Sequence, residues 1–300
     1  LTAPQFREAR DQHLWYAPFG TPPGPATVVQ APPEGGASDH PYFVDYVRRV
    51  LEERYGHRQL YRGGLRIETT LDPRLQAMAE ASVAETLSGT EAPLEMSLVS
   101  VEPSTGHVRA LVGGRDWAAS QVNLALGGSA GMQPGSSFKS FVLAAALEHG
   151  IEPETTYDAP GSMEFAGCDP TCTVDNYDSS DHGSETVREA TQNSTNTVYA
   201  QLIEQLGPQT VAEMAHRLGV SAIDPAQPYG ISLALGAYEV SPLDMAAGYA
   251  TLANRGVRQQ VTPIRRVLDR RGNVLEDNTA PEGEVVLDAA VADTTTDVLR

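Results

Sequence analysis

The segment that most constrains the fold is an apolar helix near the middle of the chain. Residues 136–150 read SSFKSFVLAAALEHG, and the apolar run Phe141 to Leu147 within them is too short to span a membrane. The turn signal Pro134-Gly135 precedes these helix-forming residues, and Gly150 is a residue type that often lies just past a helix end. We therefore expect a buried helix that begins near Ser136.

Other predicted elements surround this helix. Alternating apolar residues predict strands over 65–70, 96–101, 107–112, 261–269 and 274–277. The strands over 96–101 and 107–112 are expected to pair as one hairpin, and those over 261–269 and 274–277 as a second. Helices are expected over 42–54, after Asp72-Pro73 and after Ser241-Pro242, where Asp244 should complete a capping box. Helices are expected to dominate between the strand over 107–112 and Asn254. Strands at both ends with helices between them predict an α+β fold, a mostly antiparallel sheet flanked by helices. Residues 1–37 are rich in proline and glycine and predict an irregular tether after a first helix over 3–14.

Composition narrows the classes of function. Three hundred residues, 41% hydrophobic and 20% charged, are ordinary for a globular protein with one large core or two smaller ones. A net charge of -18 argues against nucleic acid as a partner, because nucleic-acid binding needs basic patches. The seven histidines have no metal-ligand spacing. No cofactor and no metal are expected.

The chain has a single lysine, Lys139, among 21 lysines and arginines. Arginine pairs with carboxylates as well as lysine does, but only a lysine amine can lose its proton near neutral pH and act as a base. Ser136 and Lys139 are three residues apart, so they share one face of the expected helix. The positive end of the helix dipole favours a developing alkoxide at Ser136. The spacing therefore predicts an activated serine nucleophile.

A second polar pattern, Ser194-Thr195-Asn196, falls between two predicted helices. Ser184 is expected to cap a helix running to about Thr191, and Asn196 or Thr197 to open the next one. In an extended loop, residues two apart project to the same side, so Ser194 and Asn196 can both face a cleft. Taken alone, the pattern is more often a capping turn than a site.

Together, the S-x-x-K and S-x-N patterns resemble the motifs of the penicillin-binding proteins and serine β-lactamases. The similarity is greatest to the class A, bifunctional penicillin-binding proteins, and it extends through the segments 40–56, 63–80, 96–114 and 235–256. It implies a transpeptidase fold over residues 62–300, preceded by a connector over residues 1–61 from a glycosyltransferase domain. It also implies a D,D-transpeptidase that crosslinks peptidoglycan and is trapped by β-lactams.

The resemblance assigns roles to four residues. Ser136 would be the nucleophile and Lys139 its base, Ser194 would relay a proton to the leaving amine, and Asn196 would hold the substrate amide and Lys139. The implied partners are stem peptides ending in D-Ala-D-Ala, β-lactams and other cell-wall synthesis proteins. The implied location is the extracytoplasmic face of the bacterial membrane, with the membrane reached only through an anchor outside this segment.

The family's third motif is absent, because a chain with one lysine has no K-T-G sequence. We expect the protein to continue beyond Arg300 into a K-T-G or K-S-G strand within roughly a few dozen residues, the span of one helix and one strand. Residues 1–300 alone are then expected to acylate poorly. A glycosyltransferase domain and a membrane anchor are expected before residue 1.

Several alternatives remain open. A hydrolase, either a carboxypeptidase or a β-lactamase, would share the acylation step, and a non-catalytic wall-binding or sensor module would need no third motif. Cys168 and Cys172 are expected to form a disulfide, with two unrelated thiols as the alternative. Gly127 to Gly131 matches G-x-S-x-G, but no helix directly follows Ser129, so a glycine-rich loop is expected there.

Overall fold

The computed structural model describes residues 13–16, 26–29, 38–91, 93–166, 172–177 and 179–300. Strands β1 (His13–Tyr16) and β2 (Ala26–Val29) pair in parallel within the predicted tether. Most of the helix expected over residues 3–14 lies outside the described residues. Its last two positions belong to β1, so the helix prediction is wrong there.

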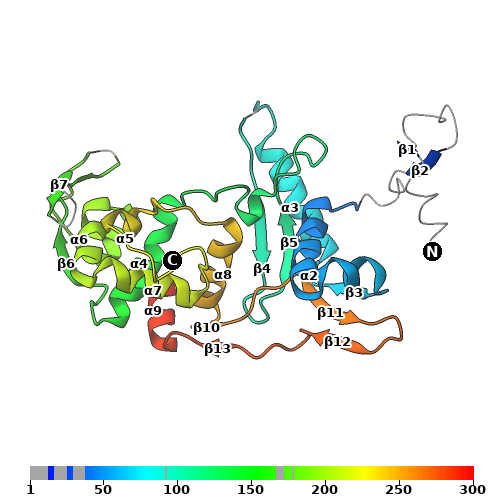
Figure 1. The fold of residues 1–300 in the computed structure, drawn as a ribbon. Coiled ribbons are helices and arrows are strands. Elements are labelled where there is room, and N and C mark those ends of the chain that lie inside the picture. The colour runs from blue at the N-terminus through cyan, green and yellow to red at the C-terminus, as the bar shows by residue number, and fades with distance from the viewer. Residues whose placement is uncertain (1–12, 17–25, 30–37, 92, 167–171, 178) are drawn as a thin grey trace.

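One end of the molecule brings an early segment and a late segment of the chain together (Figure 1). Helix α2 (Pro41–Arg62) leads into strand β3 (Arg66–Thr69). Strand β11 (Ile264–Leu268) pairs antiparallel with β3 on one side and with β12 (Val274–Asp277) on the other. The predicted hairpin of β11 and β12 is confirmed, and its partner strand comes from almost 200 residues earlier.

The central part consists of one helix and one hairpin. Helix α3 (Pro73–Thr86) begins behind Asp72, whose side chain accepts hydrogen bonds from two backbone N–H groups of the first turn. Strands β4 (Leu98–Val101) and β5 (Val108–Val112) form the expected antiparallel hairpin. The cap, the helix and the hairpin all follow the sequence prediction.

The other end is a helical lobe around the apolar segment. Helix α4 (Lys139–Glu148) lies inside it, and residues 141–146 are fully buried. Three helices pack against α4, namely α6 (Asn196–Leu206), α7 (Pro208–Leu218) and α9 (Ala289–Val298). This arrangement confirms that the apolar helix is central to the core. The remaining helices are α5 (Val187–Asn193), α8 (Pro242–Ala253) and the short 3-10 helices η3 (Leu124–Leu126), η4 (Gly135–Phe138) and η5 (Ile231–Leu235).

Short strands interrupt the region that was predicted to be helical. Their lengths of three or four residues leave too few alternations to give a strand signal in the sequence. The pairs in that region, both antiparallel, are β6 (Thr156–Asp158) with β9 (Ser184–Thr186) and β7 (Ser162–Phe165) with β8 (Cys172–Asp175). Beyond it, β10 (Val257–Arg258) pairs antiparallel with β13 (Glu284–Val285).

Two helix caps illustrate what the sequence can and cannot specify. Ser241 caps α8 and forms a capping box with Asp244, as predicted. Ser184 does not cap α5, because it lies in β9. Thr186 takes that place and forms a capping box with Glu189. The local pattern was ambiguous, since both Ser184 and Thr186 precede the helix.

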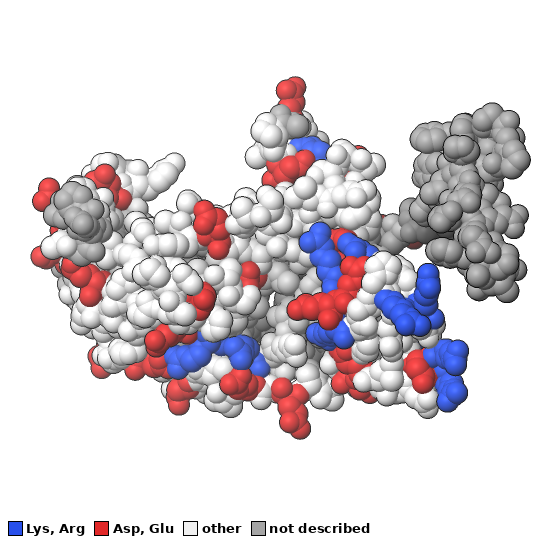
Figure 2. Space-filling model, in the orientation of Figure 1, with Lys and Arg blue, Asp and Glu red and all other residues white. Residues whose placement is uncertain are grey.

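The α+β class is confirmed, but the strands form several small sheets rather than one continuous sheet. The boundary at residues 61 and 62 stays a prediction. Phe43 and Leu51 of α2 pack in one cluster with Leu111 and Val267. Figure 2 shows acidic side chains dispersed over one face, with basic side chains gathered mainly at the end formed by α2, β11 and β12.

Candidate active site

The predicted nucleophile lies on a tight turn that leads into the central helix. Ser136 is in η4, which runs directly into α4, and the backbone N–H of Lys139 donates to the carbonyl of Ser136. In a 3-10 turn, side chains three residues apart lie one above the other, so these two residues point to one side. Ser136 is exposed, whereas Phe138 is fully buried and anchors the turn. The first turn is therefore 3-10 rather than α, but the predicted placement holds.

Two glycines fix this turn against the loop after η5. Gly135 has φ of +58° and Gly236 has φ of +68°, a region that favours glycine. The N–H of Gly135 donates to the carbonyl of Gly236 at 3.2 Å. A Cβ on Gly236 would lie 2.2 Å from the Gly135 oxygen, so a side chain there would displace the turn. From the other side, the Tyr249 hydroxyl of α8 donates to the carbonyl of Ser137 at 2.8 Å.

The amine of Lys139 is buried and held by the S-x-N segment. The residue is 4% exposed, and Nζ donates to the Ser194 carbonyl at 2.6 Å, to Ser194 Oγ at 3.0 Å and to Asn196 Oδ1 at 2.7 Å. Nζ also lies 5.2 Å from the centre of the Tyr199 ring. The structure therefore brings Lys139, Ser194 and Asn196 together, although they are 55 and 57 residues apart in sequence.

Burial prepares this amine to act as a base. It lowers the pKa of Lys139 from 10.5 to about 8, because the charged form loses its hydration. Roughly a tenth of the amine is then neutral at pH 7. Burial raises the pKa of Tyr199, so this neighbouring phenol stays protonated and cannot be the base. Lys139 is thus the titratable group of this cluster that can accept a proton near neutral pH.

The three acceptors differ in what they can do when the amine is neutral. A neutral amine keeps two N–H donors and gains a lone pair. The Ser194 carbonyl and Asn196 Oδ1 can only accept, so they can hold the two N–H groups. Ser194 Oγ can also donate, so its proton can turn toward the Nζ lone pair. This geometry gives Ser194 a route for proton exchange with Lys139.

The S-x-N segment lies in the break between α5 and α6, as predicted. Ser194 has φ of 56° and ψ of 40°, a left-handed conformation that is uncommon for a residue with a side chain. Thr195 precedes the first residue of α6 in an extended conformation. The left-handed conformation of Ser194 costs about 1–3 kcal/mol and persists only where the surrounding residues stabilise it.

A buried carboxylate provides that support. Glu185 on β9 is 4% exposed, and it accepts hydrogen bonds from Asn193 Nδ2 at 2.6 Å and from Thr195 Oγ1 at 2.6 Å. Its Oε1 also contacts His182 Nδ1 at 2.9 Å. The carboxylate therefore binds the residue on each side of Ser194. Sequence analysis missed Glu185, because in a chain with 39 acidic residues it carries no distinguishing signal.

We predict that Glu185→Gln loosens this loop without changing its shape. An amide offers one acceptor oxygen and places an NH2 group against a donor, so at least one bond to the loop is lost. The free energy of unfolding should fall by about 1.5–3 kcal/mol, the value of one hydrogen bond to a charged group. Urea denaturation measures this. Glu164→Gln, on the exposed side of β7, is the matched control and should change stability by less than about 0.5 kcal/mol.

A second polar residue missed by the sequence analysis is Asn176. It is 5% exposed, and its Oδ1 accepts from the backbone N–H groups of Asn196 and Thr197 at 3.0 and 3.2 Å. Asn176, the residue directly after β8, thus caps the first turn of α6, whereas the Thr195 side chain makes no capping hydrogen bond. No local pattern could have identified a cap that is 20 residues away.

Three of the predicted site residues line one pocket. Its volume is about 360 Å³, and Ser136, Ser194 and Asn196 line it, with Lys139 buried behind them. Within the described part of the chain, no hydrogen bond joins Lys139 Nζ to Ser136 Oγ, so the amine's three donors go to the S-x-N segment. Ser129 lies in a turn that no helix directly follows, as expected for a glycine-rich loop.

Other features outside this pocket bear on the sequence predictions. Cys172 is disulfide-bonded, while Cys168, its expected partner, lies outside the described residues. In the described ranges, no group of three or more His, Cys, Asp or Glu residues could hold a metal ion. Among the helices of the same residues, none is both long and apolar enough to cross a bilayer.

Comparison with known proteins places these motifs in a family. Residues 96–300 match the model of the penicillin binding protein transpeptidase domain. The chain is 36% identical over 251 residues to penicillin-binding protein 1A of Mycolicibacterium smegmatis, covering 79% of this chain and 31% of the relative. It is 35% identical over 248 residues to penicillin-binding protein 1A of Mycobacterium tuberculosis, covering 78% of this chain and 29% of the relative. The chain thus spans about a third of these relatives.

Solved structures agree with the sequence comparisons. The penicillin-binding protein PonA1 from Mycobacterium tuberculosis superposes with a TM-score of 0.77 at 33% identity, over 86% of this chain and 69% of that one. A second structure of PonA1 is a complex with penicillin V, with the same TM-score and coverage. The family model covers more than half of the chain, and its segment contains both the S-x-x-K and the S-x-N motifs. The chain therefore belongs to the penicillin-binding protein transpeptidase family, in the class A branch that its sequence predicts.

Proposed function

We propose that this chain is the transpeptidase region of a bifunctional cell-wall synthase, a D,D-transpeptidase that crosslinks peptidoglycan stem peptides. The observation that carries the proposal is the buried Lys139 amine, with its pKa lowered to about 8 and held by Ser194 and Asn196 at the pocket that Ser136 lines. This arrangement supports a serine acyl-enzyme without a cofactor.

Acylation begins with Ser136 Oγ, which attacks the carbonyl carbon of the penultimate D-alanine. Neutral Lys139 takes the hydroxyl proton, and the Ser136 backbone N–H donates to the oxyanion. The other half of this oxyanion hole is expected from the K-T-G strand. When the C–N bond breaks, the terminal D-alanine leaves with a proton, relayed from Lys139 through Ser194 Oγ. Asn196 holds the amine and the substrate amide in position.

The second half of the reaction transfers the acyl group. An amine of a neighbouring stem peptide attacks the ester carbonyl, loses its proton through the same relay, and releases Ser136 Oγ with its hydrogen restored. The partners are accordingly stem peptides ending in D-Ala-D-Ala, β-lactams that mimic them, and other cell-wall synthesis proteins. The reaction takes place on the extracytoplasmic face of the membrane.

Labelling with a fluorescent penicillin tests this proposal in the full-length protein. We expect one stoichiometric ester on Ser136, identified by mass spectrometry of the peptide containing residues 131–140. Ser136→Ala should give no label, and Ser137→Ala, the neighbouring serine, should still be labelled. A label that persists for hours supports a synthase, whereas release within seconds would favour a hydrolase. No label on the unsubstituted protein would favour a non-catalytic module.

The lowered pKa of Lys139 predicts how acylation depends on pH. Because the base must be neutral, the second-order acylation rate should rise about tenfold per pH unit below pH 8 and level off above it. Stopped-flow measurement with a penicillin between pH 6 and 9 gives the profile. A rate that is constant across this range would show that Lys139 does not act as the base.

A further inference from the structure

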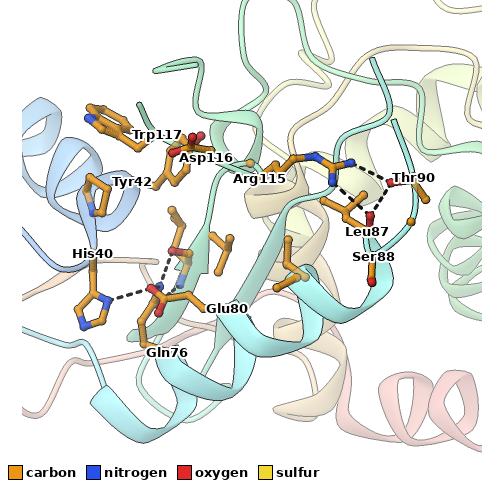
Figure 3. Close-up of a pocket in the computed structure, with 17 residues that line it drawn as sticks. His40, Tyr42, Gln76, Glu80, Leu87, Ser88, Thr90, Arg115, Asp116 and Trp117 are labelled. Carbon is orange, nitrogen blue, oxygen red and sulfur yellow. Dashed lines mark hydrogen bonds and ion pairs between the residues drawn. The ribbon is translucent and has the colours of Figure 1, made fainter. Parts of the chain in front are cut away.

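A second pocket lies outside the helical lobe, between α2, α3 and the loop after β5 (Figure 3). Its volume is about 490 Å³, within the range of about 300–1,000 Å³ that is usual for small-molecule sites. It shares no lining residue with the pocket of Ser136. Neither the predicted motifs nor the proposed reaction uses it.

The pocket has an apolar floor and an aromatic wall. Val83, Leu87 and Leu111 are each 3% exposed or less and form part of the floor. The rings of Tyr42 and Trp117 meet edge to face, with centroids 5.0 Å apart at 85°. Such a floor removes the apolar body of a ligand from water, and the aromatic faces attract a cation.

The positive charge at the rim of the pocket belongs to Arg115, whose guanidinium is already hydrogen-bonded to other protein groups. Figure 3 shows Arg115 turned toward the loop after α3, where its guanidinium donates to the Leu87 carbonyl, Thr90 Oγ1 and the Leu94 carbonyl at 2.8–3.2 Å. Its Nε also lies 3.9 Å from a carboxylate oxygen of Glu95. With these donors and this charge satisfied, Arg115 is a poor receptor for an anion.

The remaining charge of the pocket is negative. Glu80 is 41% exposed along its side chain and contacts His40 Nδ1 at 2.8 Å. Asp116 is exposed beside Trp117, and its Oδ1 accepts only the nearby N–H of Ala118 among the described hydrogen bonds. Even if His40 is protonated and neutralises Glu80, the charge of Asp116 remains. Burial, followed by the Glu95 and Asp116 carboxylates, raises the pKa of Tyr42, consistent with a negative potential at this wall.

We propose that this pocket binds an organic cation. The apolar body of the ligand lies on the floor formed by α3 and β5, and its ammonium or guanidinium group lies beside Trp117, paired with the Asp116 carboxylate. The same chemistry occurs in a free arylalkylamine and in an arginine side chain of a peptide. The ligand is bound through contacts alone, with no covalent step.

Fluorescence of Trp117 provides the readout. The chain has two tryptophans, so the full-length protein is prepared with Trp15→Phe and with any tryptophan outside this segment replaced by phenylalanine. 2-Phenylethylammonium, with about nine non-hydrogen atoms, should bind saturably with a Kd of about 1 mM. N-acetyl-arginine amide tests the peptide source. The neutral analogue 2-phenylethanol should bind at least about fivefold more weakly, because it forms neither the ion pair nor the cation–π contact.

A variant that lacks one carboxylate distinguishes binding of the cation in this pocket from non-specific attraction of the cation to an acidic protein. Asp116→Asn should weaken binding of the ammonium probe about fivefold, whereas Glu164→Gln, which removes a carboxylate on β7, should leave it unchanged. Circular dichroism checks that both variants are folded. Equal binding of the neutral analogue, an unchanged Kd in Asp116→Asn, or no saturation up to about 20 mM would each overturn the proposal. Penicillin labelling of Ser136 is independent of all these outcomes.

Discussion

In the full-length protein, Lys139→Arg is expected to slow acylation by a penicillin by about 10⁴-fold, the upper range for loss of a general base. A guanidinium keeps its proton at every pH at which the protein is folded, so it cannot take the hydroxyl proton of Ser136. The planar group also cannot reproduce the three bonds of Nζ to the Ser194 carbonyl, Ser194 Oγ and Asn196 Oδ1. The measurement is the second-order rate constant for covalent labelling.

Two controls make this result interpretable. Arg270→Lys, an equally conservative exchange at an exposed position, should label at the normal rate. The unfolding midpoint of Lys139→Arg in urea should show that the variant is folded, since the enlarged side chain enters a buried site. Labelling of a folded Lys139→Arg protein within about tenfold of the normal rate would disprove the role of Lys139 as base.

Asn196→Ala is expected to slow acylation about tenfold to a thousandfold, the scale of losing one preorganised hydrogen-bonding group. The substitution removes Oδ1, an acceptor of the Lys139 amine, and Nδ2, which donates to the Asp175 carbonyl at 2.9 Å. The amine then keeps the two Ser194 acceptors but loses the contact that fixes its direction. Penicillin labelling at several concentrations measures the loss.

The effect of Asn196→Ala on catalysis can be distinguished from its effect on folding, because Asn196 is the first residue of α6 and another residue caps this helix. Because Asn176 caps α6 through backbone N–H groups, Asn196→Ala should leave the helix intact and reduce stability by no more than about 1–2 kcal/mol. Asn273→Ala, in the exposed turn between β11 and β12, should leave acylation unchanged. A normal acylation rate in Asn196→Ala would mean that the S-x-N segment is only a capping turn.

The sequence predicts elements whose signals are local. Asp72 and Ser241 cap their helices because the cap, the following proline and the first turn are contiguous, and the hairpin of β4 and β5 follows from alternation around a turn. Placing Ser136 at a helix start also needed only its neighbours. Lys139 could be predicted as the base because it is the single lysine in a chain whose other side-chain cations are arginines.

What the sequence could not supply are contacts between distant segments. Glu185 supports the S-x-N loop from β9 and Asn176 supports it from the position directly after β8, and both strands are too short to produce a periodic signal. Gly236 and Gly135 are 101 residues apart in sequence, and the residues around neither glycine predict their close approach. The expectation that helices dominate the region between β5 and Asn254 failed at β6, β7, β8 and β9 for the same reason, because these short strands are stabilised by pairing between β6 and β9 and between β7 and β8, not by local preference.

The sheet that joins β3 to β11 sets an order of events during synthesis. Strand β3 emerges early, but its partner follows almost 200 residues later, which is about 10–40 s at about 5–20 residues per second. Until then, one edge of β3 offers its backbone groups to any other strand nearby. This end of the molecule therefore cannot close before β11 has emerged, and an unfinished chain is open to mispairing throughout that interval.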